Sequence, residues 1–340
     1  MNSLNELKNW MNIKDNIKIF DRPERGMYST KDIKKNHVII KIKSKYILSY
    51  NNIYAKHPIN NIDEKNSLVA FYLLKLFKEN DEWWLPYISS FPNDISEYLY
   101  YWSNNNLKLL NNTSIMTNGF YNYKSHMESL EYDWSVIYSY IKENNLFESN
   151  TYNNYDELYD LYIKFRILVG SRIFGYKIHD VDDSGMVPYI DMINHSFESN
   201  TAWFYDDNID CFILLATKDI LKGMEILDDY GNKSNIDLLL FYGFTLPNNP
   251  YSILRVKINN KIYEINSNLI INMNEIIDEL DESYPTDTVG LININKEDNF
   301  KNKIKYLYDH HINELVKIKD QNIKNIYIDE IYIMKQLIKI

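Results

Sequence analysis

The pattern of hydrophobic and polar positions divides the chain into strand-like and helical stretches. Residues 4–11 have the spacing of a short amphipathic helix. Between residues 17 and 50 apolar residues alternate with polar neighbours, which is typical of half-buried strands. From about residue 66 to 175 the apolar period becomes helical, with Ser67 as a candidate helix cap.

The strongest helical pattern runs from about Asp156 to Phe174. Arg172 lies on its apolar face, in line with Phe165 two turns earlier. An arginine that faces a protein core needs an anionic or carbonyl partner, because burying a bare charge is very costly. The pattern therefore indicates that Arg172 has a specific partner in the interior.

Strand signals return between residues 186 and 265. The segments are Met186–Ile190, Thr201–Tyr205, Cys211–Ala216, Ile226–Leu227 and Ile253–Ile258. One short helix interrupts them, capped by Ser234 or Asn235 and ended by Gly243. After about residue 266 the pattern is mainly helical, and His310-His311 falls on a helix where we expect it at the surface.

This order predicts an α+β protein in which small sheets are split by a long helical insertion and followed by a mainly helical C-terminal lobe. We expect a β-rich domain over residues 1–256. It would consist of strands at 17–50, a helical insertion at about 51–185 and a second strand-rich part at about 186–256. Residues 257–340 would then form the C-terminal lobe.

Composition narrows the class of protein. A net charge of −10 argues against a general nucleic-acid binder, because such proteins present a basic face. The chain has neither an apolar run long enough for a membrane span nor a secretory pattern at its N-terminus, so we expect neither. The single cysteine, Cys211, excludes an internal disulfide framework or a thiolate-rich zinc cluster, and its apolar surroundings are typical of an inert core thiol. A reducing compartment, cytoplasmic or nuclear, is the expectation.

Candidate chemistry begins with the apolar run that ends in Asp191, Asn194 and His195. Polar groups on such a run must find hydrogen-bond partners. Taken alone, the segment is most simply a satisfied turn after a buried strand. The carboxyl pair Asp228-Asp229 has no further ligands at metal-binding spacing, so no metal site is expected.

Two Tyr-Gly steps, Tyr230-Gly231 and Tyr242-Gly243, flank the short helix. Glycine lets a backbone approach a ligand closely, and tyrosine offers an apolar ring with a hydroxyl. A glycine-punctuated hairpin and a capped helix explain the same residues without a ligand. A third segment, Arg25–Ile33, contains a lone glycine turn before a strand, which by itself is weak evidence.

Together and in this order, these clusters resemble the SET-domain methyltransferases, specifically the class of the Rubisco large-subunit lysine methyltransferase and its actin-histidine relative. The resemblance covers most of the chain. Its motifs are Arg25–Ile33, Trp84–Ile88 with Phe91-Pro92, Ser171–Phe174, Asp191–Ser196, and Tyr230-Gly231 through Ser234-Asn235 to Tyr242-Gly243-Phe244. The chain departs from the family where Glu24 replaces the first glycine of a Gly-x-Gly, and in its shorter C-terminal lobe, for which the resemblance implies substrate binding.

The resemblance implies a protein methyltransferase that uses S-adenosylmethionine. The cofactor-binding residues that it implies are Arg25, Gly26, Met27, Arg172, Asn194, His195, Tyr230 and Tyr242. Arg172 would be a charge partner in the cofactor pocket. In-line methyl transfer needs a neutral amine held at about 3 Å from the methyl group. Tyr230 is the expected catalytic residue, and it would orient the amine and cofactor rather than act as a base, because an ordinary tyrosine has a pKa of about 10.

For the substrate, the resemblance implies contacts with Ser171, Phe174 and Asp191, with backbone carbonyls near Ser171 and Asp191 facing the target amine. Phe174 favours lysine, because the lysine-modifying relative has Phe there and the histidine-modifying one has Asn. By periodicity alone Phe174 is equally well explained as core.

The expected partner is a lysine-containing protein, bound by a monomer, with no nucleic acid or membrane involved. Two alternatives stay open. One is a protein-histidine methyltransferase. The other is a catalytically silent SET fold that serves as a peptide-binding scaffold.

Overall fold

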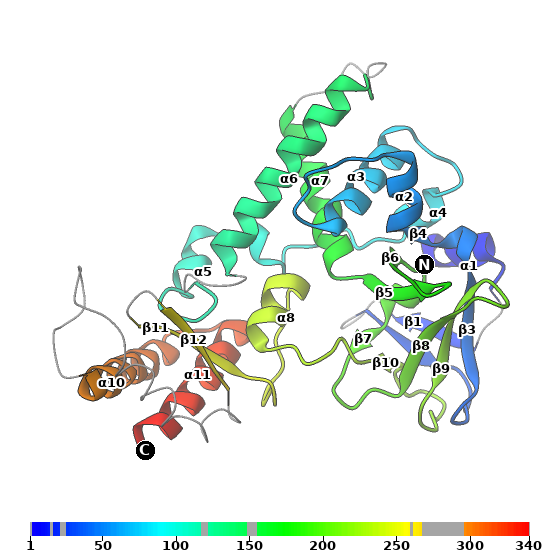
Figure 1. The fold of residues 1–340 in the computed structure, drawn as a ribbon. Coiled ribbons are helices and arrows are strands. Elements are labelled where there is room, and N and C mark those ends of the chain that lie inside the picture. Colours follow the sequence, from blue (N-terminus) through cyan, green and yellow to red (C-terminus); the bar gives the residue numbers. More distant parts are fainter. Residues whose placement is uncertain are drawn as a thin grey trace. The chain divides into compact units, whose positions relative to one another are not determined.

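The computed structural model describes residues 2–13, 16–20, 25–116, 122–147, 155–258, 261–266 and 296–339 (Figure 1). Its helices are α1 (Asn2–Met11), α2 (Tyr50–Lys56), α3 (Lys65–Lys78), α4 (Leu85–Ile88), α5 (Asn104–Lys108), α6 (Tyr123–Glu143), α7 (Tyr155–Gly170), α8 (Asn235–Tyr242), α10 (Lys296–Leu315) and α11 (Gln321–Lys339). Its strands are β1 (Ile17–Phe20), β2 (Gly26–Ser29), β3 (Val38–Lys43), β4 (Leu48–Ser49), β5 (Ile173–Ile178), β6 (Val181–Met186), β7 (Asn194–His195), β8 (Thr201–Asp206), β9 (Cys211–Ala216), β10 (Leu227–Asp228), β11 (Ile253–Ile258) and β12 (Lys261–Asn266). Small sheets and many helices confirm the predicted α+β class.

The chain forms two compact units. The first comprises residues 1–93 and 129–231, and the second comprises residues 94–128 and 232–340. β11 runs across the predicted domain boundary after residue 256 and pairs with β12. The assignment of the C-terminal residues as a substrate-binding lobe stays a prediction.

Small sheets build the first unit. β1 and β2 form an antiparallel pair, and two three-stranded sheets have the orders β3-β9-β8 and β4-β6-β5. A short parallel pair joins β7 to β10 and sets Asn194 opposite Leu227 and His195 opposite Asp228. This pair brings together two motifs that are far apart in the sequence.

Helices α3 and α7 lie side by side in the first unit (Figure 1). The fully buried residues of α3 include Leu68, Val69, Ala70, Phe71, Leu73 and Leu74. A polar cluster joins the two helices, in which Arg166 donates to Glu64 Oε2 at 2.6 Å and to Ser67 Oγ at 3.0 Å. Ser67 was expected to cap a helix, but α3 already begins at Lys65, and the Ser67 hydroxyl instead donates to Asp133 at 2.6 Å.

The predicted helix from Asp156 to Phe174 is too long, because α7 ends at Gly170 and Phe174 lies on β5. Part of the predicted helical insertion is therefore an antiparallel hairpin of β5 and β6, with Phe174 opposite Gly185. His179 and Asp180 have φ values of 49° and 62° at its turn. Two successive positive φ angles suit the right-handed twist of a hairpin, but the usual glycine signal is absent from the sequence here.

The predicted strand at Met186–Ile190 is also wrong. β6 ends at Met186, Pro188 has no N–H to donate to a ladder, and Tyr189 has a φ of 74°. A 3₁₀ turn over Ile190–Met192 follows. The chain thus turns directly before β7, which places Asp191 in a turn rather than on a strand.

The second unit contains the predicted short helix, α8. Ser234 caps it through a reciprocal capping box with Asp237, and Gly243 ends it with a φ of 82°. Asn235 donates from Nδ2 to Asp329 Oδ2 on α11 at 2.7 Å, so this motif residue joins two helices of the unit.

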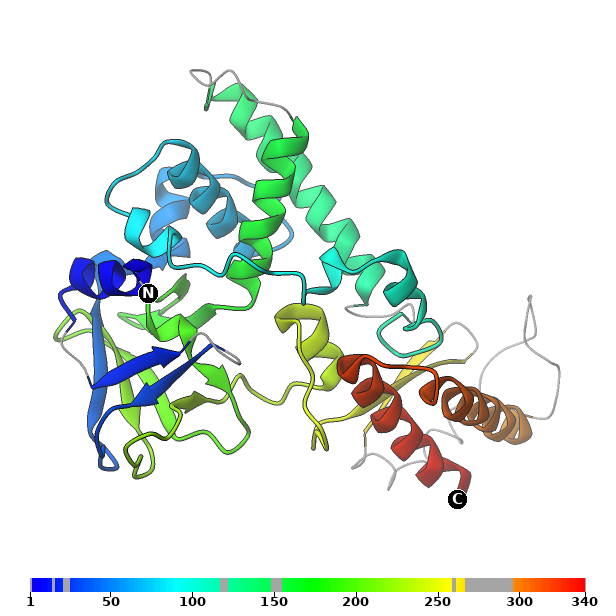
Figure 2. The same ribbon diagram turned by 180° about the vertical axis from the view of Figure 1, so that it is seen from behind.

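Helices α10 and α11 lie side by side in the second unit (Figure 2). His311 of α10 was expected at the surface, but it is buried and its Nε2 lies 2.8 Å from Glu330 Oε2. Glu330 Oε1 accepts a backbone N–H from Ser114 at 2.7 Å. The expectation for His311 fails because the face of α10 that carries it packs against α11.

Two sequence expectations about the environment of the chain can be compared with the described residues. Cys211 is buried, and burial raises the pKa of its thiol, as expected of an inert core cysteine. None of the helices in the described ranges is both long and apolar enough to cross a membrane.

Candidate active site

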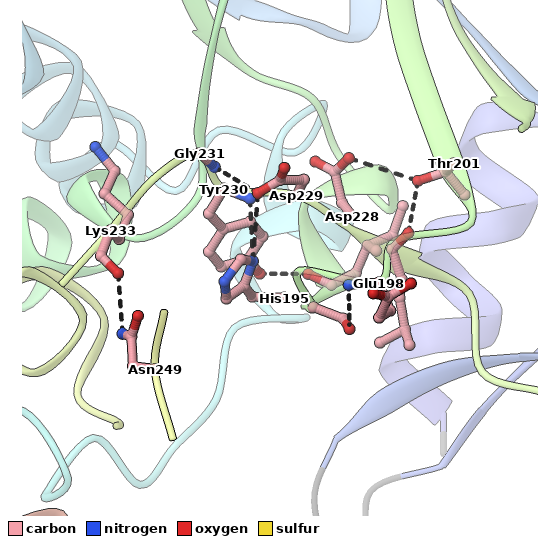
Figure 3. Close-up of polar contacts among 12 residues, drawn as sticks. His195, Glu198, Thr201, Asp228, Asp229, Tyr230, Gly231, Lys233 and Asn249 are labelled. Atoms are coloured by element: carbon pink, nitrogen blue, oxygen red, sulfur yellow. Dashed lines mark hydrogen bonds and ion pairs between the residues drawn. The ribbon is translucent and has the colours of Figure 1, made fainter. Parts of the chain in front are cut away.

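His195 and Tyr230 lie against each other at the ends of the parallel strands β7 and β10 (Figure 3). Their rings are stacked, with centroids 5.0 Å apart and planes 26° apart. The Tyr230 backbone N–H donates to His195 Nδ1 at 3.1 Å, and the Tyr230 hydroxyl donates to the Ile193 carbonyl. Backbone, ring and hydroxyl of Tyr230 are therefore all held by the segment that contains β7.

The hydrogen bond from Tyr230 sets the protonation of His195. Because Nδ1 accepts an N–H, the proton of the neutral imidazole sits on Nε2. Burial lowers the pKa of His195, and the Asp229 carboxylate, 4.0 Å from Nδ1, only partly opposes this. Burial thus favours the neutral imidazole, and the bond from the Tyr230 N–H helps to fix the orientation of the ring.

Asn194 joins the N-terminal motif to the strand segment before Tyr230. Its Nδ2 donates to the Arg25 carbonyl at 2.7 Å and to Glu225 Oε1 at 2.8 Å. Gly26 lies beneath these contacts, and a Cβ there would stand 2.4 Å from Glu225 Oε1 and 3.1 Å from Asn194 Nδ2. Any larger residue at this position would therefore push the Glu225 carboxylate and the Asn194 amide away from their present positions.

Met27, the third residue predicted in this motif, is a core residue. Its side chain is fully buried on β2 and lies opposite Ile19 of β1. Its carbonyl accepts the Ile226 N–H at 2.7 Å. Met27 therefore fastens β2 to the segment that precedes β10, and any contact with a ligand would come from its backbone.

Two arginines converge on the turn that carries Asp191. Arg172 Nη1 donates to the Asp191 carbonyl at 2.9 Å, which supplies the carbonyl partner that the sequence required. Arg25 donates to the Ser90 carbonyl at 2.9 Å and to Met192 Sδ at 3.6 Å. Both guanidinium groups act on the Asp191 carboxyl through their charge.

Asp191 itself is buried. Tyr87 donates its hydroxyl to Oδ2 at 2.6 Å, whereas Oδ1 has no hydrogen-bond partner within the described part of the chain. Burial raises the pKa of Asp191, opposed by the charge of Arg172 and the bond from Tyr87. Two cations around one buried carboxyl leave a positive environment that suits an anionic group of a ligand.

The residues predicted to contact a substrate lie on both sides of Arg172. Ser171 follows α7, and its hydroxyl donates to the Leu168 carbonyl at 3.2 Å. Phe174 is half-buried on β5. Its ring stands edge-on to Trp203 at 5.2 Å and contacts Phe212 at 5.3 Å between centroids.

A family model of the SET domain matches residues 24–231, which is more than half of the chain. The chain belongs to the SET-domain family. The match contains all the predicted site residues except Tyr242. It begins at Glu24, which lies outside the described residues, and ends at Gly231 directly after Tyr230.

Curated proteins similar to this SET domain differ in their target residue. A ribosomal lysine N-methyltransferase of Schizosaccharomyces pombe is 28% identical over 238 residues, covering 67% of this chain and 41% of the relative. An actin-histidine N-methyltransferase of Xenopus tropicalis is 24% identical over 262 residues, covering 72% of this chain and 43% of the relative. The chain thus spans about two fifths of the length of each.

Solved structures show the same fold. The SET domain of LSMT bound to methyllysine and AdoHcy has a TM-score of 0.69 at 17% identity, covering 99% of this chain and 90% of that one. Rubisco LSMT bound to AdoMet has a TM-score of 0.67 at 17% identity, covering 99% and 91%. These likenesses confirm the predicted SET fold.

The geometry adds residues that the sequence did not single out as part of the site. Tyr87 had appeared only within a motif, and Glu225 and Trp203 had no assigned role. Trp203 lies two residues after Thr201 on β8 and so on the same face of the strand, which a strand-face argument could have used to point to it. Tyr242 lies on α8 in the second unit, and its assignment to the cofactor site stays a prediction.

Proposed function

We propose that this SET domain is a protein-lysine N-methyltransferase that uses S-adenosylmethionine. The observation that carries the proposal is the convergence of three motifs in the first unit. Arg25-Gly26 contacts Asn194, and His195 contacts Tyr230. The curated relatives named above are methyltransferases, which supports the same activity.

The donor set fits the proposed cofactor. S-adenosylmethionine carries a carboxylate and an ammonium, and when bound it supplies a methyl group on an electrophilic sulfonium. Arg25 and Arg172 would hold the cofactor carboxylate, because two guanidinium charges lie near a single buried carboxyl, that of Asp191. The Glu225 carboxylate would accept from the ammonium, and the Nε2–H of His195 would donate to a polar edge of the cofactor.

Tyr230 would orient the target amine. Its hydroxyl donates a hydrogen bond to the Ile193 carbonyl, and the lone pairs of its oxygen would accept an N–H from the amine. An ordinary tyrosine is protonated at neutral pH and is therefore a poor base. The amine must therefore lose its proton to water or to its surroundings before attack, and Tyr230 only fixes its direction.

Phe174 supports lysine over histidine as the target. It presents an apolar ring that other rings hold from the side, which suits the methylene stem of lysine. We expect Phe174→Asn to lower lysine methylation by about 10-fold, since it replaces the apolar contact with an amide. A lysine peptide library and a matched library with histidine at the same positions, each incubated with isotope-labelled cofactor, measure both activities.

The peptide libraries also decide between the alternatives. Isotope label found only in the histidine library would establish that the protein is a histidine methyltransferase. If neither library becomes methylated although the cofactor binds, the result would favour the catalytically silent scaffold. Absence of calorimetric heat on adding S-adenosylmethionine would favour it too. If the wild-type protein and Phe174→Asn methylate lysine peptides equally, the proposed contact of Phe174 with the lysine stem would be refuted. The proposed lysine methyltransferase activity would still stand.

Gly26 offers a test of the cofactor pocket. A methyl group there must displace Glu225 and Asn194, so we expect Gly26→Ala to weaken S-adenosylmethionine binding by about 10-fold or more. Isothermal calorimetry measures this directly. Gly175→Ala is the matched control, because no atom lies within 4 Å of a Cβ at Gly175. Equal affinities in the two variants would show that the cofactor does not bind near Gly26.

We further propose that the domain acts as a monomer on a protein segment in the cytoplasm or nucleus, without a nucleic-acid or membrane partner. The net charge of −10 favours approach of basic, lysine-containing segments. The C-terminal residues 257–340 would contribute to holding that segment.

A further inference from the structure

A buried carboxyl next to the proposed reaction centre has no part in the mechanism above. Asp228 lies on β10, two residues before Tyr230, and is 5% exposed. Trp203 donates its indole Nε1–H to Asp228 Oδ2 at 3.1 Å. The Thr201 hydroxyl lies 3.5 Å from Oδ1 (Figure 3). Both partners come from β8.

The Trp203 indole, whose N–H bonds Asp228, belongs to a group of three rings that all contact one another. Trp203 stacks on Phe212 with centroids 5.3 Å apart and planes 22° apart. Phe174 stands edge-on to Trp203 at 85° and contacts Phe212 at 64°. The hydrogen bond from Trp203 to Asp228 therefore helps to fix the orientation of the indole ring, which Phe174 meets edge-on.

Burying the Asp228 carboxyl has an energetic cost. Burial raises the pKa of Asp228 to about 6, which means that the charged form is disfavoured in the folded protein. The bond from Trp203 and the neighbouring backbone N–H of Asp229 only partly offset that effect. Buried groups whose ionisation is disfavoured gather at functional sites, and Asp228 directly adjoins one.

We propose that Asp228 is a positioning residue for the target side chain, because through Trp203 it sets the Phe174 ring on which the lysine stem would pack. This inference rests on the proposed lysine methyltransferase function. Asp228 would act on substrate affinity and leave the cofactor contacts unchanged.

The first measurement needs no substrate. The indole N–H of Trp203, assigned by its loss in Trp203→Phe, is expected to exchange slowly with solvent in the wild-type protein. Asp228→Ala removes the acceptor and should accelerate that exchange by about 10-fold or more. Asp228→Asn retains an acceptor oxygen and should restore protection.

The second measurement is binding of free L-lysine in the presence of S-adenosylhomocysteine, followed by calorimetry. We expect Asp228→Ala and Trp203→Phe each to weaken lysine binding by about 10-fold, and S-adenosylhomocysteine binding by no more than about twofold. Their effects should not add in the double variant, because both remove the same link. Trp134→Phe is the matched control, since the buried Trp134 indole N–H has no acceptor among the described residues.

The outcomes separate the positioning role from a structural one. Restoration of lysine affinity by Asp228→Asn supports positioning. Unchanged lysine affinity in both Asp228→Ala and Trp203→Phe would overturn it, as would a parallel loss of cofactor affinity. Absence of lysine binding in the wild-type protein would instead refute the proposed function, while slow indole exchange would still establish the bond between Asp228 and Trp203.

Discussion

Replacing Tyr230 with phenylalanine is expected to lower turnover by about 10²-fold while changing S-adenosylmethionine affinity by less than about threefold. The phenylalanine ring keeps the stacking on His195, and the backbone N–H still donates to Nδ1, so the pocket stays in place. Only the hydroxyl is lost, and with it the group proposed to direct the amine.

Single-turnover methylation of a lysine peptide and calorimetry with the cofactor measure the two effects separately. Tyr205→Phe is the matched control, because the Tyr205 hydroxyl bonds Asp210 at the surface. Its turnover should equal that of the wild-type protein. Turnover of Tyr230→Phe equal to that of Tyr205→Phe would refute the proposed role, and a loss of cofactor affinity equal to the loss of turnover would assign Tyr230 to binding instead.

Replacing Arg166 with methionine is expected to lower the free energy of unfolding by about 3 kcal/mol. Arg166 is 3% exposed and donates to Glu64 and to Ser67, whose hydroxyl is bonded to Asp133. The charge of Arg166 also helps to hold down the pKa of the Asp133 carboxyl, which burial raises. Methionine restores the apolar packing but leaves two carboxylates without their cation.

Equilibrium unfolding in urea near neutral pH measures this effect. Lys34→Met is the control, because Lys34 and its partner Asp219 are exposed, and an exposed ion pair adds little to stability. We expect no measurable shift of its unfolding midpoint. Equal midpoints for the two variants would show that the cluster around Arg166 does not stabilise the first unit.

Elements with a clean local signal could be predicted closely from the sequence. β9 and β11 have the predicted bounds, and α8 begins and ends at residues whose capping chemistry is local. β5 could not be predicted, since the apolar spacing of α7 continues into it and its turn uses His179-Asp180 instead of glycine. The spacing of apolar residues cannot show where α7 ends and β5 begins, because over such a short stretch a helix and a strand can have the same apolar positions.

The candidate site could be predicted as a set of motifs but not as a set of contacts. Asn194 was an expected ligand residue, whereas its hydrogen bonds to Arg25 and Glu225 depend on how strands far apart in sequence come into register. The pairing of Trp203 with Asp228 depends in the same way on β8 and β10. Such partners follow from tertiary structure, on which residue spacing within one segment carries no information.

The pairing of the two-residue strands β7 and β10 limits when the site can form while the chain is being synthesised. The groups that meet there come from positions near residues 25, 194 and 230, so the site is made almost wholly of non-local contacts. Chains are synthesised from the N-terminus, and non-local pairing forms slowly because loop closure must come first. During translation, β10 must therefore leave the ribosome before these contacts can form. The N-terminal motif cannot make them until most of the chain has been synthesised.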